Sequence, residues 1–183
     1  LYEKQGDKWE QTVDLIAGED ELDSSFGLTA ALHQGGEWLA VSAGSFDHSP
    51  SGNQGKVVIF RRSADGLWVR AGQMVDSEPN IFELFGTELR SSGDLLAVNI
   101  PFEKVGDVPG AGAVSIYQFA PRELMGWRHS VTLHAPIPTP ARVGFGARFD
   151  MADGWLAAMA VRTSGGESHS VIYVSRNLGE PHD

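Results

Sequence analysis

The sequence predicts an all-β protein, and three observations lead to that fold class. A group of residues recurs along the 183-residue chain with a period of 59 or 60, so the chain is built from repeats. Each repeat holds short apolar runs bounded by Gly, Asp and Ser, as strands between turns do. No stretch sustains the i, i+3, i+4, i+7 spacing of apolar residues that an amphipathic helix needs.

The repeat is marked by three landmarks that keep one order. A Trp comes first, a Phe-Gly pair follows 17 or 18 residues later, and a Leu-Ala step comes after the pair. The landmarks are Trp9, Phe26-Gly27 and Leu39-Ala40; then Trp68, Phe85-Gly86 and Leu96-Ala97; then Trp127, Phe145-Gly146 and Leu156-Ala157. Their constant order and spacing indicate copies of one structural unit.

Each unit divides into four predicted strands. The Phe-Gly pair leads into the first strand, and the Trp begins the fourth. The second strand holds the Leu-Ala step and is apolar throughout, which is typical of burial on both faces. The third is rich in β-branched and aromatic residues. The second strands cover residues 38–41, 95–98 and 155–158, and the third strands cover 57–60, 114–117 and 171–174.

The recurring aromatic residues are expected to be structural. Because the Trp residues recur with the repeat, we expect them to pack between units. The Gly after each Phe should permit two backbones to approach closely.

Four strands in 59 or 60 residues, stacked radially, are typical of a β-propeller blade. The pattern also resembles the FG-GAP repeat of integrin alpha chains and of many bacterial surface and secreted proteins. That repeat runs through Phe-Gly, Leu-Ala-Val, Gly-Ala-Pro, a loop, an aromatic strand and Trp, and here the Gly-Ala-Pro triplet is degenerate in all three units. The resemblance implies blades of four antiparallel strands, about three of them in this chain, as part of a six- or seven-bladed ring.

Residues 1–183 are therefore predicted to form a single partial β-propeller. The approximate blades are 16–72, 73–133 and 134–183, with 1–15 as the outer strand of a preceding or swapped blade. Three blades alone expose two apolar faces, which forfeits on the order of 10 kcal/mol. The remaining blades should come from the rest of a longer chain, or a second copy should complete a six-bladed ring. A stable monomer of 19.7 kDa would contradict both.

Calcium-binding FG-GAP repeats carry several Asp or Asn residues before the Leu-Ala step. Here only Asp150 and Asp153 stand in such a stretch, and two carboxylates fall short of the six to eight oxygen ligands that calcium takes. Asp153-Gly154 is interpreted as a hairpin turn. We expect no metal and no cofactor, and only a weak cation site near the two Asp residues stays open.

Composition and motifs disfavour several classes of function. The chain has 24 acidic and 14 basic residues, and its net charge of −10 disfavours nucleic acid as a partner. It has no Cys, and it lacks the G-x-S-x-G, H-E-x-x-H and G-x-x-x-x-G-K-[ST] motifs, so we expect no enzymatic activity. The longest apolar run, residues 155–161, is too short to cross a bilayer, so no transmembrane segment is expected.

The loops that follow the Leu-Ala strands differ between units and lie at one end of the predicted blades. Because loops on rigid scaffolds carry function, they form the expected ligand-binding face. Its residues are Phe46, Asp47, His48, Phe102, Glu103, Asp107, Arg162 and Glu167. We predict a non-catalytic binding or adhesion module that recognises a protein or glycan through this face. The alternative is an accessory propeller attached to a larger secreted enzyme. The resemblance implies that the protein is secreted or at the cell surface.

Overall fold

The computed structural model describes residues 1–19, 24–47, 52–77, 82–138, 144–164, 166–176 and 178. Thirteen β-strands are the regular elements of these residues, and none of these elements is an α-helix. The prediction of an all-β protein is therefore confirmed.

The strands form four antiparallel sheets, whose order is given by hydrogen-bonded neighbours. A hairpin at the start of the chain pairs β1 (Tyr2–Gln5) with β2 (Lys8–Gln11). The first sheet contains β3 (Phe26–Leu32), β4 (Trp38–Ala43), β5 (Lys56–Arg62) and β6 (Trp68–Met74) in that order. The second sheet contains β7 (Leu89–Ser92), β8 (Leu95–Ile100), β9 (Ala113–Phe119) and β10 (Trp127–His134) in that order. The third sheet contains β11 (Phe149–Ala152), β12 (Trp155–Ser164) and β13 (Glu167–Arg176) in that order.

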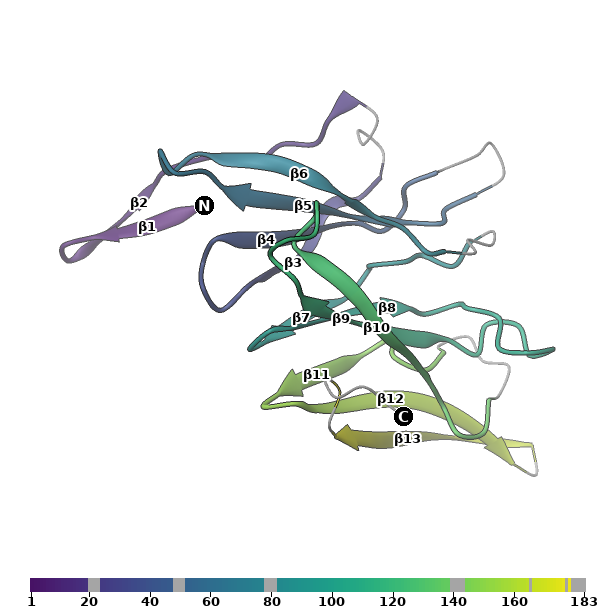
Figure 1. Ribbon diagram of the computed structural model, residues 1–183. Coiled ribbons are helices and arrows are strands. Elements are labelled where there is room, and N and C mark those ends of the chain that lie inside the picture. Colours follow the sequence, from purple (N-terminus) through teal and green to yellow (C-terminus); the bar gives the residue numbers. More distant parts are fainter. Residues whose placement is uncertain are drawn as a thin grey trace.

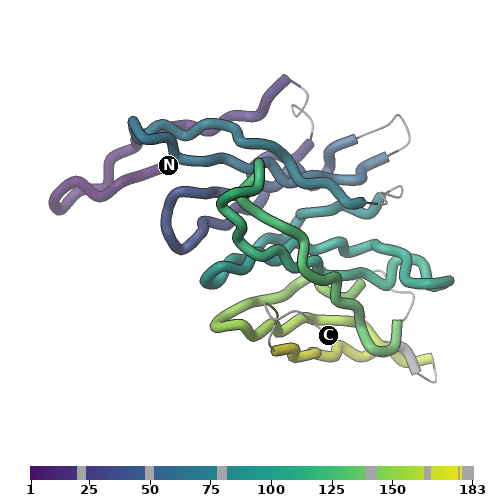
Figure 2. Tube along the Cα trace, viewed as in Figure 1, coloured from purple at the N-terminus to yellow at the C-terminus, as the bar shows by residue number. Residues whose placement is uncertain are grey.

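The three larger sheets are stacked face to face in chain order, with the first above and the third below in Figure 1. The backbone trace in Figure 2 shows that the stack is open and does not close into a ring. Each sheet matches one repeat of the sequence, since the Leu-Ala step lies in its second strand. Among the described residues, the third sheet has three strands where the repeat predicted four.

The Leu-Ala step explains why the central strands are buried on both faces. Successive side chains of a strand point to opposite sides. Leu96 therefore enters the core between the first and second sheets, while Ala97 enters the core between the second and third. All residues of β4 and β8 are buried, as the apolar sequence of these strands predicted.

Neighbouring sheets approach each other closely at the Phe-Gly pair. The Phe85 amide donates a hydrogen bond of 2.8 Å to the Gln54 carbonyl, just before β5 of the first sheet. A Cβ atom on Gly86 would overlap the Val57 Cγ2 methyl group. The same contacts recur between the second and third sheets, where the Phe145 amide bonds the Ala111 carbonyl at 2.7 Å and Gly146 lies against Val114.

The stacking brings together residues that are one repeat apart in the sequence. The Ser91 hydroxyl donates to the Leu32 carbonyl at 2.6 Å across 59 residues. Arg148 pairs with Glu88 at 3.3 Å across 60 residues. The period of the sequence is thus the step from one sheet to the next.

The beginning of the chain differs from the expectation of a single outer strand. Residues 1–15 contain two paired strands, β1 and β2, which correspond to the third and fourth strands of a repeat. An ion pair of 2.6 Å between Glu3 and Arg62 joins this hairpin to the first sheet.

The recurring Trp residues, which are expected to pack between units, differ in their burial. Trp68 is half-buried against a core cluster of the first sheet, together with Leu15. Trp127 is buried, and its ring contacts that of His33 from the first sheet, with 5.5 Å between centroids. Trp9 is 67% exposed, because no sheet described in the structure lies beyond its hairpin.

The predicted loop at residues 162–167 is mostly strand. β12 and β13 continue to pair through Arg162↔His169, Thr163↔Ser168 and Ser164↔Glu167. Gly166 has a φ of 84°, which suits the tight turn of a two-residue hairpin. Because the connection is so short, the backbone pairing of β12 and β13 continues up to the turn.

Substitution of Gly86 by Ala tests the close approach of the first two sheets. Gly27 is the matched control, because it holds the same place in its repeat with a similar φ (83° against 81°) and has open space around it. Either substitution lowers the free energy of unfolding by about 1–2 kcal/mol, because Ala disfavours the left-handed backbone conformation. Gly86→Ala lowers it by about 1–3 kcal/mol more, because the added methyl group overpacks against Val57. We expect urea unfolding to show a clearly larger loss of stability for Gly86→Ala. Equal losses would contradict this role of the Phe-Gly pair.

Candidate functional site

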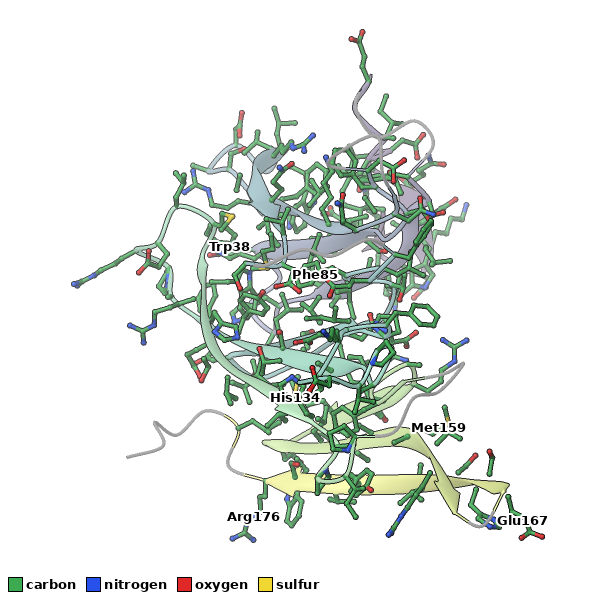
Figure 3. All side chains as sticks on the ribbon, turned by 90° about the vertical axis from the view of Figure 1, so that its right-hand side faces the viewer. Trp38, Phe85, His134, Met159, Glu167 and Arg176 are labelled. Carbon is green, nitrogen blue, oxygen red and sulfur yellow. The ribbon has the colours of Figure 1, made fainter. Side chains whose placement is uncertain are left out.

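The connections after the second strands lie at one end of the stack. The β4–β5, β8–β9 and β12–β13 connections are on the right-hand side of Figure 1, the side that faces the viewer in Figure 3. We call this end of the molecule the loop end.

An apolar groove lies at the loop end, where the first and second sheets meet. Its volume is about 430 Å³. Asn53 comes from the β4–β5 connection, and Phe82 and Leu84 come from the segment before β7. The β8–β9 connection supplies the opposite wall, with Phe102, Pro109 and Gly110. Two neighbouring repeats therefore build the groove jointly.

Backbone strain positions the two apolar side chains of the middle segment. Phe82 and Leu84 have φ angles of 63° and 56°, in the left-handed region that bulky residues rarely adopt. The Leu84 amide donates to the Asn53 carbonyl at 3.3 Å, which helps to hold this conformation against the first sheet. Strain of this kind persists only where the surroundings enforce it, and it is concentrated at functional sites.

Glu83, between the two strained residues, lies on the other side of the segment. Its side chain is 1% exposed and lines a second cavity of about 180 Å³. This cavity is polar, and its lining consists of Asp76, Ser77, Glu83, Ile100, Glu103, Lys104, Thr132 and His134. The segment therefore separates an apolar groove from a polar cavity.

Carboxylates dominate the polar cavity. His134 Nε2 lies 3.3 Å from Glu103 Oε1, while the buried Glu103 Oε2 has no hydrogen-bond partner among the described residues. Burial and the negative charge of Asp76 raise the pKa of Tyr117 above its ordinary value. The cavity can hold water or a donor group, and it favours positive charge over negative charge.

The expected site residues of the first loop have different surroundings. Phe46 is half-buried, and the Lys56 ammonium lies 3.6 Å from the centre of its ring. Lys56 is itself fully buried and bonds Gln73 Oε1 at 3.3 Å. Phe46 therefore has a packing role. Asp47 is exposed, and His48 lies outside the described residues.

The other expected residues are spread over the loop end. Phe102 lines the apolar groove, and Glu103 lines the polar cavity. Asp107 is exposed on the β8–β9 connection. Arg162 and Glu167 are exposed on the β12–β13 hairpin, with Glu167 near its tip in Figure 3.

Sequence reasoning missed Phe82 and Leu84. Both precede the Phe-Gly pair of the second repeat, where the first repeat has the polar residues Asp23 and Ser25. The apolar residues at these two positions of the second repeat are the sequence signal that could have identified this part of the groove.

The stretch considered for a cation forms a turn. Asp153 and Gly154 have φ angles of 50° and 76° and connect β11 to β12 in a two-residue hairpin, as predicted. In the ranges that the structure describes, no three His, Asp or Glu side chains are grouped so that they could hold a metal ion. None of the described residues forms a helix with the length and hydropathy needed to cross a bilayer.

Asn in place of Phe82 tests the strain in the groove. Asn tolerates the left-handed region better than Phe, so Phe82→Asn should raise the free energy of unfolding by up to about 1 kcal/mol. Phe102→Asn is the control, because Phe102 lines the same groove without a positive φ. That variant loses apolar contact with no relief of strain and should be destabilised. Urea unfolding measures the free energy of unfolding of both variants. A destabilised Phe82→Asn variant would contradict the interpretation that the backbone at Phe82 is strained.

Comparison with known proteins finds no protein-family model that matches this chain, and no curated protein that matches it in sequence.

Proposed function

We propose that the three stacked sheets are blades of a β-propeller of the FG-GAP type, and that they form a non-catalytic binding or adhesion module. The repeat spacing and the recurrence of one contact pattern between neighbouring sheets support the fold. The ligand is a protein or a glycan bound at the loop end. The natural location of such a module is the cell surface or the secreted fraction.

The observation that carries this proposal is the apolar groove. Phe82 is 57% exposed and Phe102 is 37% exposed, so two aromatic rings at one seam are accessible to a partner. Binding sites combine apolar and aromatic walls with a few polar groups that fix orientation. Here Asn53 is such a polar group beside the rings. Aromatic rings pack equally well on apolar side chains of a protein and on the C–H faces of sugars.

The rigid setting of the groove supports recognition. The hydrogen bonds of the Phe85 and Leu84 amides attach the groove segment to the β4–β5 connection. A preorganised site loses little conformational freedom when it binds. Further blades, from the rest of a longer chain or from a second copy, are the other partners that the proposal includes.

The binding test uses two probes, an array of immobilised oligosaccharides and a phage-displayed library of random peptides. We expect selective binding to one of them, reduced at least tenfold by Phe102→Ala and by Phe82→Ala. The matched control is Leu124→Ala, because Leu124 is 87% exposed in the β9–β10 connection, away from the groove. Circular dichroism checks that all variants fold. Failure of both probes, or full binding by Phe102→Ala, would contradict the proposal.

A further inference from the structure

The apolar groove and the polar cavity at the loop end are built from adjacent residues of the same two segments. In the segment before β7, Phe82 and Leu84 line the groove, while Glu83 between them lines the cavity. In the β8–β9 connection, Phe102 lines the groove and the next residue, Glu103, lines the cavity. Along both segments, an apolar surface and an acidic surface are therefore one residue apart.

The polar cavity opens at the surface of the molecule. Ser77, Lys104 and His134 are exposed and form its rim. Glu83 and Ile100 are 1% and 2% exposed and form its floor. Alternate strands of an antiparallel sheet run in the same direction, so β10, which carries His134, ends at the loop end as β8 does (Figure 3). A side chain of a partner can enter the cavity from the end at which the groove is accessible.

Glu103 is held in place by its backbone and by His134. Its amide donates to the Ile100 carbonyl at 3.2 Å, and its carbonyl accepts a hydrogen bond from the Gly112 amide at 3.1 Å. His134 Nε2 lies 3.3 Å from Oε1, whereas the buried Oε2 has no hydrogen-bond partner among the described residues. A buried carboxylate oxygen without a donor is costly, so a partner that supplies a donor is favoured.

Negative charge predominates around this carboxylate. Among the described residues that line the cavity, the carboxylates of Asp76, Glu83 and Glu103 outnumber the single ammonium, that of Lys104. The whole chain has a net charge of −10. A cation is therefore attracted to the cavity and an anion is repelled from it.

We propose that the partner of the groove is a protein segment in which an apolar side chain and a Lys or Arg side chain are close together in sequence. This inference rests on the proposed function, because it takes the groove as the binding site. The apolar side chain packs on Phe82 and Phe102, and the basic side chain enters the polar cavity and donates to Glu103. Consecutive Cα atoms are about 3.8 Å apart, so ligand residues one to three positions apart span the single backbone segment between the two hollows.

The charge of the cavity favours a protein over a glycan. A neutral sugar gains nothing from the negative potential, and an acidic sugar is repelled by it. Lys and Arg have apolar stems that can pass along the Phe-lined groove, and they present several N–H donors at their ends. They therefore match both hollows with one pair of side chains.

Selection of phage-displayed random peptides on the intact chain is the first test. We expect the enriched peptides to carry Lys or Arg within three positions of an aromatic or aliphatic residue. The affinity of such a peptide should fall roughly fivefold between about 50 and about 500 mM NaCl, because salt screens the attraction. Replacement of its basic residue by Gln should weaken binding by a similar factor.

Substitutions in the chain identify the group that the basic residue meets. Glu103→Gln should weaken the basic peptide roughly fivefold and leave the Gln version of that peptide unaffected, as expected for a coupled pair. Lys104→Gln should strengthen binding of the basic peptide roughly twofold, because it removes a competing positive charge. Glu123→Gln is the matched control, since Glu123 is exposed in the β9–β10 connection at the opposite end of the stack. Lys104 is exposed, so its variant tests the charge of the cavity even where Glu103→Gln disturbs folding.

The outcomes distinguish this inference from the proposed function. If Phe102→Ala removes binding while Glu103→Gln and Glu123→Gln behave alike, the groove binds without the cavity, and only the inference is wrong. Enriched peptides without basic residues, or binding to oligosaccharides alone, also overturn the inference and leave the proposed function intact. Failure of both probes contradicts both.

Discussion

The structure depends on the close contact between one sheet and the next. Each of the two larger core clusters contains residues of two neighbouring sheets, and a third, smaller cluster lies on the other face of the first sheet, where Leu15 packs against it. Gly86 and Gly146 permit this contact because a side chain at either position would overlap the preceding sheet. Stability is therefore a sum of nearest-neighbour terms, as in other repeat architectures, and a sheet without a neighbour lacks half of its core.

The same contact determines where a binding site forms. The hydrogen bonds that join the Leu84 and Phe85 amides to residues 53 and 54 also bring the connections of two repeats to one seam. Variation in those connections then changes the groove without changing the sheets. Phe82 and Leu84 show this, because they occupy strained positions that the contact itself enforces. The scaffold and the proposed site thus rest on one set of backbone contacts.

Features set by the repeat were predictable from the sequence, and features set by single contacts were not. The Leu-Ala step and the Phe-Gly pair predicted the buried strands and the close approach, because their spacing repeats. In the candidate site, Phe102 was predicted from its place in a variable loop. The left-handed backbone at Phe82 and the burial of Lys56 beside Phe46 had no sequence signature, since both arise from tertiary packing. The continued pairing of β12 and β13 follows from a connection too short to form a loop.

The third sheet, at the end of the stack, has a central strand that is apolar on both of its faces. The residues of β12 have the same alternation-free apolar sequence as those of β4 and β8, yet only one of its faces is covered within the described residues. Sequence encodes burial of a face without identifying what covers it. In the first two sheets the cover is the next repeat. At Trp155 and Ile172 the same chemistry remains accessible. The accessible face of the third sheet therefore has the chemistry that a further blade of the proposed propeller would cover.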